Sequence, residues 1–351
     1  MNPMIKNLEE FYIQWHITAR CNLRCHHCYQ EEYNAKSELS LLDLYKIADQ
    51  ITMALKKWKM KGRIALTGGE PFLKDELFPL MEYLEQNENT WRIGILTNGI
   101  IIDQKIVDKL KTFKKLYYIQ ISLDGAKEKT NDFIRGKGSF KKAINSFRLL
   151  NDNGIKTRLM YTVHKKNIQD VSSLIDLAIN ENIKTLTIER FVPEGQGAEF
   201  KDWFLSKDEI HNLFQEIVQR AELEYQKGTP LQIIKYRTLW AIINPDRTKI
   251  PDVPLEIDLG GMCSIGIDSL TILQDGTVYP CRRLPIPIGN LLEDSIFKIW
   301  YTSDVLWKIR NKNNLKGKCN KCELIPRCSG CRAIAYAMTG DYLSEDPQCW
   351  K

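Results

Sequence analysis

Three cysteines close together near the N-terminus have the spacing that most directly suggests chemistry. Cys21, Cys25 and Cys28 follow the pattern C-x3-C-x2-C, and no further cysteine occurs before Cys263. Three thiolates on one short loop can hold three corners of a four-iron cluster and leave the fourth iron without a protein ligand. A metal that performs catalysis needs such an open position. The spacing also allows a structural zinc site in which a histidine between Cys25 and Cys28 is the fourth ligand.

A second motif with ligand-binding chemistry is Gly68-Gly69-Glu70-Pro71. Paired glycines let the backbone approach a ligand closely and leave amide and carbonyl groups exposed. The Glu70 carboxylate can accept charge-assisted hydrogen bonds from an ammonium group. The same four residues could form a simple turn, so their meaning depends on the motifs beside them.

Seven further cysteines lie in the C-terminal part of the chain. Their pattern is C-x17-C, followed after a gap by C-x2-C-x5-C-x2-C-x17-C. Zinc ribbons separate their two C-x2-C pairs by about fifteen residues. The short separation and the number of thiols therefore favour two metal clusters over one tetrahedral site. These cysteines are Cys263, Cys281, Cys319, Cys322, Cys328, Cys331 and Cys349.

The bulk composition indicates a cytoplasmic globular protein. The chain has 351 residues, of which 43% are hydrophobic and 27% charged, values that are ordinary for soluble domains. No apolar run approaches the roughly 18 residues that cross a bilayer, and the N-terminus lacks the apolar core of a signal peptide. In a reducing cytoplasm, ten cysteines indicate metal ligation before disulfides. The net charge of +6 arises from 50 Lys and Arg against 44 Asp and Glu. Most of the lysine clusters lie beside apolar positions, which indicates solvated faces rather than a nucleic-acid-binding surface.

Strand-like and helix-like segments alternate from residue 11 to residue 190, at the spacing of βα units. Six such units predict an α/β fold with an open, partial (β/α)6 TIM-type barrel, since eight would close it. Each motif follows a strand, at the edge where such sheets place their active sites. Ser206 and Glu209 predict a capping box for a sixth helix, and Asp275-Gly276 predicts a hairpin. The predicted strands are Phe11–Ile17, Arg63–Thr67, Arg92–Thr97, Leu116–Leu123, Lys156–Thr162 and Lys184–Arg190, and the helices between them are Leu41–Trp58, Leu77–Gln86, Lys105–Phe113, Phe140–Asn151 and Val171–Ile179.

We predict three parts of the chain. Residues 1–235 form the partial barrel, residues 236–258 a bridge with an interrupted apolar pattern, and residues 259–351 a small cysteine-rich α+β domain. Because the last part is short and rich in loops, we expect ligated metal to supply the stability that its small core lacks.

Together, the first two motifs resemble those of the radical SAM superfamily. In that family C-x3-C-x2-C holds a [4Fe–4S] cluster, and S-adenosylmethionine (SAM) chelates the open iron through its amine and carboxylate. The resemblance implies that SAM is cleaved reductively to a 5′-deoxyadenosyl radical, which abstracts hydrogen from a substrate. It also implies an external electron donor such as flavodoxin or ferredoxin. The SAM contacts that it implies are Gly68, Gly69 and Glu70 for the amine, Arg135 for the carboxylate, the backbone of His27 for adenine, and Asn98 and Ser122 as polar contacts.

The C-terminal cysteines resemble the SPASM extension of this superfamily, which holds two auxiliary [4Fe–4S] clusters. Three clusters in all are therefore implied. The x2 spacing of the last C-x2-C pair is one residue shorter than is common in the family. The first auxiliary cluster has only three evident cysteines, so its fourth iron is either open or bound by another residue. The resemblance assigns Cys263, Cys281 and Cys331 to the first auxiliary cluster, and Cys319, Cys322, Cys328 and Cys349 to the second.

The segment from Cys328 to Cys349 looks most like family members that process ribosomally made peptides or tetrapyrroles. An open iron could bind a substrate thiolate, so the leading hypothesis is a peptide that receives a thioether or cross-link. Side-chain processing of a tetrapyrrole in a heme pathway is the alternative, and a non-catalytic iron–sulfur protein is a third hypothesis. The chain begins shortly before the first strand, so we expect any leader-binding protein to be separate. Sulfatase maturation is disfavoured, because those enzymes usually carry Asp directly after the second SPASM cysteine, where this chain has Arg282.

Overall fold

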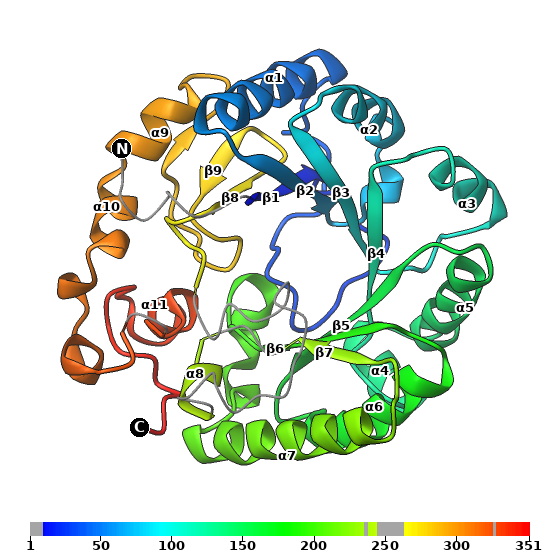
Figure 1. Cartoon of the computed structure of the whole chain (residues 1–351), viewed down its shortest axis with the longest axis vertical. Coiled ribbons are helices and arrows are strands. Elements are labelled where there is room, and N and C mark those ends of the chain that lie inside the picture. The colour runs from blue at the N-terminus through cyan, green and yellow to red at the C-terminus, as the bar shows by residue number, and fades with distance from the viewer. Residues whose placement is uncertain (1–9, 235–237, 244–262, 326–327) are drawn as a thin grey trace.

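One curved β-sheet forms the framework of the molecule (Figure 1). The computed structural model describes residues 10–234, 238–243, 263–325 and 328–351. The sheet found within these residues has ten strands in the order β10-β9-β8-β1-β2-β3-β4-β5-β6-β7. The strands are β1 (Glu10–Thr18), β2 (Lys61–Gly68), β3 (Thr90–Thr97), β4 (Leu116–Ser122), β5 (Thr157–Val163), β6 (Thr185–Arg190), β7 (Gln232–Ile234), β8 (Ser269–Ile272), β9 (Thr277–Tyr279) and β10 (Gly289–Asn290).

Strand β1 shows how the sequence separates the two faces of the sheet. Successive side chains of a strand point to opposite faces, and the alternate residues Phe11, Ile13 and Trp15 are buried in the main hydrophobic core. The ring of Phe11 lies 4.9 Å from that of Trp58, which belongs to helix α1 (Leu41–Trp58). His16 occupies the opposite, inner face of the barrel, where it is also buried.

The helices cover the outer face of the barrel, as Figure 1 shows. The predicted bounds of α1 and α2 are confirmed. These bounds could be predicted because an apolar stripe runs the full length of each helix. Both hydrogen bonds of the predicted capping box link Ser206 and Glu209 at the start of α7. The remaining helices are α2 (Leu77–Gln86), α3 (Gln104–Leu110), α4 (Glu128–Arg135), α5 (Ser139–Asp152), α6 (Val171–Asn180), α7 (Lys207–Gln226), α8 (Trp240–Ile243), α9 (Ile296–Thr302), α10 (Asp304–Arg310) and α11 (Arg332–Thr339).

The predicted partial barrel is confirmed, with two additions. All six predicted strands are present and parallel, and β7 extends the sheet beyond β6. With three residues β7 is too short to show a periodic pattern. Helix α4 is the second addition. Most of the predicted bridge, residues 236–258, lies outside the described residues. None of the described helices combines the length and the apolarity needed to span a membrane.

The cysteine-rich C-terminal part is joined to the barrel through the sheet. Strand β8 pairs in parallel with β1, so that Tyr12 lies opposite Ser269 and Trp15 opposite Ile272. The predicted hairpin is confirmed, with β8 and β9 antiparallel around Asp275-Gly276. In Figure 1 the orange and red helices α9, α10 and α11 lie on the side of the barrel that the outer helices leave uncovered. The C-terminal part therefore continues the barrel rather than standing beside it.

A buried ion pair fastens the end of β6 to the C-terminal tail. Both guanidinium nitrogens of Arg190 donate to the Asp346 carboxylate, at 2.8 and 3.1 Å. Arg190 also donates to Gln348 at 2.8 Å and to Thr238 at 3.0 Å. Both charged side chains are buried. Burial alone would raise the pKa of Asp346, but Arg190 outweighs this effect and lowers it.

This pair yields a stability prediction. Asp346→Asn leaves the buried Arg190 charge without a charged partner, and breaking a buried pair in this way costs about 3–5 kcal/mol. We expect a markedly lower midpoint in anaerobic thermal unfolding. The matched control is Arg148→Gln, which breaks an Arg–Glu pair whose arginine is mostly exposed, and should shift the midpoint little. Equal midpoints for the two variants would contradict the proposed importance of the buried pair.

Candidate functional site

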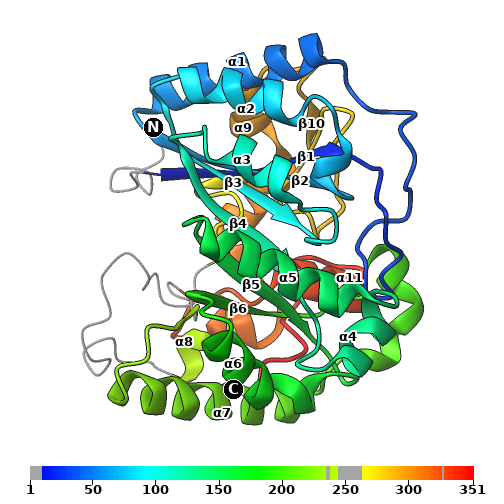
Figure 2. The same ribbon diagram turned by 90° about the vertical axis from the view of Figure 1, so that its right-hand side faces the viewer.

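The N-terminal cysteines lie on the loop that follows β1, at the C-terminal edge of the sheet. Figure 2 shows this loop, in blue, running from the end of β1 towards α4. The amide of His26 donates to the carbonyl of Ile134 in α4 at 3.0 Å, and that of Cys28 to the carbonyl of Cys25 at 3.1 Å. The loop is therefore held both by its own turn and by α4.

The two glycines of the Gly68–Pro71 motif are required by the backbone that enters this loop. A Cβ atom on Gly68 would lie 2.2 Å from the carbonyl oxygen of Thr18, and one on Gly69 would lie 2.3 Å from that of Arg20. The amides of Gly69 and Glu70 donate to these same two carbonyls at 2.9 and 2.7 Å. The motif thus places the start of the cysteine loop directly over the end of β2.

Glu70 is a fully buried carboxylate beside this contact. One oxygen accepts from the Thr97 hydroxyl at 2.7 Å, and the other from the Asn98 amide at 2.8 Å. The amide of Phe72 donates a third hydrogen bond at 3.2 Å. A carboxylate offers about four acceptor positions, so one is left for a further donor. Burial raises the pKa of Glu70 to about 7, although these hydrogen bonds oppose the rise.

Asn98 and Ser122 follow on the next two strands. The Asn98 side chain donates to Asn22 at 2.7 Å and faces the Cys21 sulfur at 3.9 Å. Ser122 is the last residue of β4 and is half-buried. The structure therefore brings Glu70 and Asn98 to the cysteine loop, with Ser122 at the same edge of the sheet.

Arg135 and His27 meet at a buried carboxylate that sequence analysis did not single out. Asp124 accepts from Arg135 at 2.6 Å, from His27 Nε2 at 2.9 Å and from the amide of Thr162 at 2.7 Å. Arg135 also faces the Cys25 sulfur at 3.9 Å. Burial would raise the pKa of Asp124, but Arg135 and His27 outweigh it and hold the pKa well below its usual range. Asp124 lies two residues beyond Ser122 and directly follows a predicted strand. This position could have identified it as a candidate site residue.

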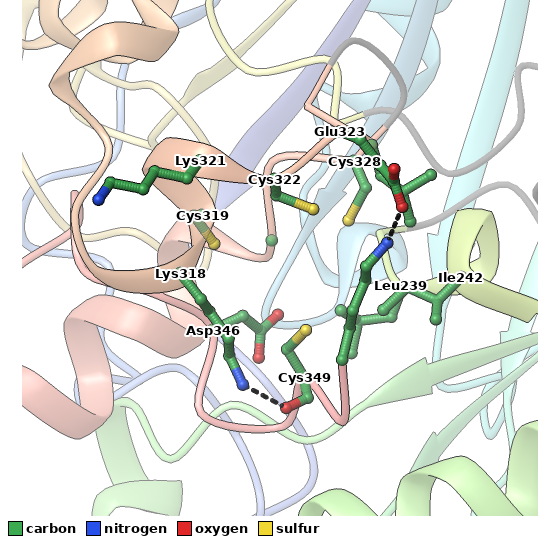
Figure 3. A pocket seen from close by; sticks show the side chains of 13 residues that line it. Leu239, Ile242, Lys318, Cys319, Lys321, Cys322, Glu323, Cys328, Asp346 and Cys349 are labelled. Carbon is green, nitrogen blue, oxygen red and sulfur yellow. Dashed lines mark hydrogen bonds and ion pairs between the residues drawn. The ribbon is translucent and has the colours of Figure 1, made fainter.

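Four of the C-terminal cysteines surround one cavity. Figure 3 shows the sulfurs of Cys319, Cys322, Cys328 and Cys349 directed into it. The cavity has a volume of about 270 Å³, and its wall includes Asp346, the partner of Arg190. The four thiols line the cavity without converging on one position. Among the described residues, no group of three His, Cys, Asp or Glu side chains is arranged to hold a single metal ion.

The other three C-terminal cysteines form a second group. Cys263, Cys281 and Cys331 pack against the same small apolar cluster, which includes Val192, Ile265 and Leu284. Burial raises the pKa of the Cys263 thiol to about 11, and the neighbouring Cys331 and Cys281 add to the rise. The seven cysteines therefore fall into the two sets that the sequence predicted, although their roles as ligands stay a prediction.

Comparison with known proteins places these arrangements in a family. The family model "Radical SAM superfamily" matches residues 15–178, and the model "Iron-sulfur cluster-binding domain" (SPASM) matches residues 263–332. The chain belongs to the radical SAM superfamily. It carries a SPASM domain, so iron–sulfur clusters and SAM are its implied cofactors. The number of clusters stays a prediction.

Relatives of this radical SAM protein include a heme synthase, an Fe-coproporphyrin III synthase and a bacteriocin biosynthesis protein. The AdoMet-dependent heme synthase of Methanosarcina barkeri is 29% identical over 347 residues, which cover 96% of this chain and 95% of that protein. The Fe-coproporphyrin III synthase of the same organism is 29% identical over 359 residues (96% and 87%). The antilisterial bacteriocin subtilosin biosynthesis protein AlbA of Bacillus subtilis is 27% identical over 325 residues (90% and 65%).

Solved structures show the same fold. Streptococcus suis SuiB bound to the precursor peptide SuiA superposes with a TM-score of 0.77 at 18% identity, covering 97% of this chain and 76% of that one. At this identity the likeness concerns the fold alone. It confirms the predicted fold, an open partial α/β barrel followed by a smaller C-terminal domain.

The residues of this radical SAM protein fit the clusters that the family implies. Sulfur atoms of a bound cluster carry negative charge, and hydrogen-bond donors near them stabilise it. The amide of Leu23 donates to the Cys21 sulfur at 3.4 Å, and the side chains of Asn98 and Arg135 face the Cys21 and Cys25 sulfurs. Burial raises the pKa of Cys25 to about 12, and Arg135 opposes this rise. Metal binding would have to displace that proton.

The raised pKa of Glu70 predicts how SAM binding depends on pH. Only the ionised carboxylate attracts the SAM ammonium strongly, and with a pKa of about 7 this form is lost as the pH falls through neutrality. We expect SAM to bind about tenfold more weakly at pH 6 than at pH 8, measured by anaerobic calorimetry on reconstituted protein. Glu70→Gln should bind weakly at both pH values and keep its iron. A Glu70→Gln variant with the same pH dependence as the wild type would refute this placement of the amine.

The division of the cysteines predicts a selective loss of metal. Reconstituted protein should hold about twelve irons, and Cys349→Ala about eight, because the second auxiliary set has no spare thiol. Solubility should also fall, since ligation contributes to the folding of such domains, while SAM cleavage without substrate should persist. Ser329→Ala is the control, because Ser329 is buried, lies between Cys328 and Cys331 in the sequence and is not a predicted ligand. Full iron content in Cys349→Ala would show that this residue is not a ligand.

Proposed function

We propose that this radical SAM protein acts on a tetrapyrrole and removes a hydrogen atom from one of its carboxylate-bearing side chains. The observation that supports this function is the similarity to the heme synthase and the Fe-coproporphyrin III synthase of Methanosarcina barkeri, which extends over 96% of the chain. The sequence alone favoured a peptide. The relatives favour a tetrapyrrole instead. The similarity to peptide enzymes of known structure concerns the fold alone and therefore carries less weight for the choice of substrate.

The described residues suggest how the chain serves this reaction. When bound, the first cluster and SAM would supply radical chemistry that no amino-acid side chain can perform. Cys21, Cys25 and Cys28 would hold that cluster, Glu70 the SAM amine, and Arg135 the SAM carboxylate. Gly68, Gly69, Asn98, Ser122 and the backbone of His27 would complete the SAM site.

An aromatic layer would limit the access of water to this site. His26 packs on Phe200 with ring centroids 5.1 Å apart, and Trp203 packs on His164 at 4.7 Å. Trp203 and His164 are buried. Excluding water prevents side reactions of reactive species, so this layer suits radical chemistry.

A peptide substrate is the second candidate, and two observations favour it. AlbA, a bacteriocin biosynthesis protein, is similar over 90% of the chain. The set of Cys263, Cys281 and Cys331 has three thiols, so a cluster there could leave one iron for a substrate thiolate. Thioether or cross-link formation would then require a cysteine-containing precursor and, by analogy, a separate leader-binding protein. Either substrate requires an external electron donor such as flavodoxin or ferredoxin.

A direct assay separates the two candidates. Reconstituted enzyme, SAM and a chemical reductant are incubated with Fe-coproporphyrin III, and the products are analysed by mass spectrometry. We expect 5′-deoxyadenosine together with a tetrapyrrole that has lost mass from a side chain. The Cys21, Cys25 and Cys28 triple Ala variant is the inactive control. Conversion of a cysteine-containing precursor peptide, with the tetrapyrrole unchanged, would instead establish the second candidate.

A further inference from the structure

Arg282 differs from the neighbouring arginines in having no acidic partner. Arg283 pairs with Glu189 at 3.1 Å, and Arg190 pairs with Asp346. Arg282 forms no ion pair with any acidic side chain in the described part of the chain. It is nevertheless half-buried, and its Nε atom is fully buried without a hydrogen-bond partner. A buried donor without a partner costs free energy, so this position suits an external ligand.

The contacts of Arg282 place it between the N-terminal cysteine loop and Cys281 of the C-terminal group. Its Nη2 donates to the carbonyl of Tyr29 at 3.1 Å, and its guanidinium carbon lies 4.3 Å from the centroid of the Tyr29 ring. Tyr29 directly follows Cys28 of the N-terminal loop, and Arg282 directly follows Cys281 of the C-terminal group. A ligand on this guanidinium would therefore lie close to both cysteine groups.

The titratable side chains near Arg282 include His16 and Glu194, and neither forms an ion pair with it in the described part of the chain. Burial and the charge of Arg282 hold the pKa of His16 well below its ordinary value, so this imidazole is neutral. Glu194 interacts electrostatically with Arg282, and burial raises the pKa of Glu194. A guanidinium has five N–H donors, and the structure shows one of them in use, on Tyr29. Its planar fork matches the two oxygens of a carboxylate.

We propose that Arg282 binds a carboxylate group of the substrate and holds it between the N-terminal cysteine loop and Cys281. This inference rests on the proposed function, since tetrapyrroles of this class bear carboxylate side chains. It assigns Arg282 as a specificity-determining residue. Its two contacts with Tyr29, to the ring and to the carbonyl, hold the guanidinium in place and limit the directions from which a carboxylate can approach.

The test compares a tetrapyrrole that has free carboxylates with one that has none. Fe-coproporphyrin III and its tetramethyl ester are titrated into reconstituted wild type, Arg282→Gln, Arg282→Lys and Arg148→Gln, and binding is followed by quenching of tryptophan fluorescence. We expect the wild type and Arg148→Gln to prefer the free acid by about tenfold to a hundredfold, the range of a charge-assisted hydrogen bond. Arg282→Gln should lose this preference, and Arg282→Lys should keep part of it.

The possible outcomes separate this inference from the proposed function. Iron content and SAM affinity are measured for each variant, so that only correctly assembled protein is compared. If the wild type binds both tetrapyrroles equally, or if Arg282→Gln keeps the preference for the acid, the role of Arg282 is refuted while the proposed function stands. If the wild type binds neither compound, the proposed function fails, and the inference fails with it.

Discussion

The placement of the N-terminal cysteines depends on one buried carboxylate, that of Asp124. It is fully buried and accepts from Arg135 in α4, from His27 in the cysteine loop and from the backbone of Thr162 in β5. A buried carboxylate is costly unless its acceptor positions are filled. The three elements therefore have to meet at Asp124 together, and the loop cannot shift along the sheet edge without leaving a buried charge unsatisfied. The interaction specifies geometry more than it adds stability.

The C-terminal part is also positioned by a buried carboxylate that is paired with an arginine. Asp346 is also fully buried and paired with an arginine, and one of its oxygens accepts from the amide of Cys331 at 2.8 Å. Asp346 also lies in the wall of the cavity around the other cysteine set. Asp346 is thus bonded to the backbone of one cysteine set and lines the cavity of the other. Because Arg190 ends β6, both groups are positioned relative to the barrel by a strand, which is more rigid than the loops that bear the cysteines.

Local patterns in the sequence predicted the elements but not these pairs. The bounds of α1 and α2, the capping box at Ser206 and the hairpin at Asp275-Gly276 depend on neighbouring residues, and all are confirmed. The motif spacing likewise placed Glu70 and Asn98 beside the cysteine loop. Arg190 and Asp346, in contrast, are 156 residues apart, and no local pattern connects them. Gly68 and Gly69 were predicted to approach a ligand, whereas the structure shows that they also admit the backbone of the cysteine loop.

The residue after Cys281 connects this architecture with the choice of substrate. Enzymes that mature sulfatases resemble this chain in their motifs but usually carry Asp at that position, where this chain has Arg282. A reversal of charge beside the same cysteine changes which substrate groups can be buried there, because a carboxylate and a guanidinium attract opposite partners. A positive charge that lies between the two cysteine groups attracts an anionic side chain of a substrate to this place. Arg282 lies there, stacked on Tyr29 and without an acidic partner among the described residues. The electrostatics of this one position thus support an anionic substrate, and the carboxylates of a tetrapyrrole meet that requirement.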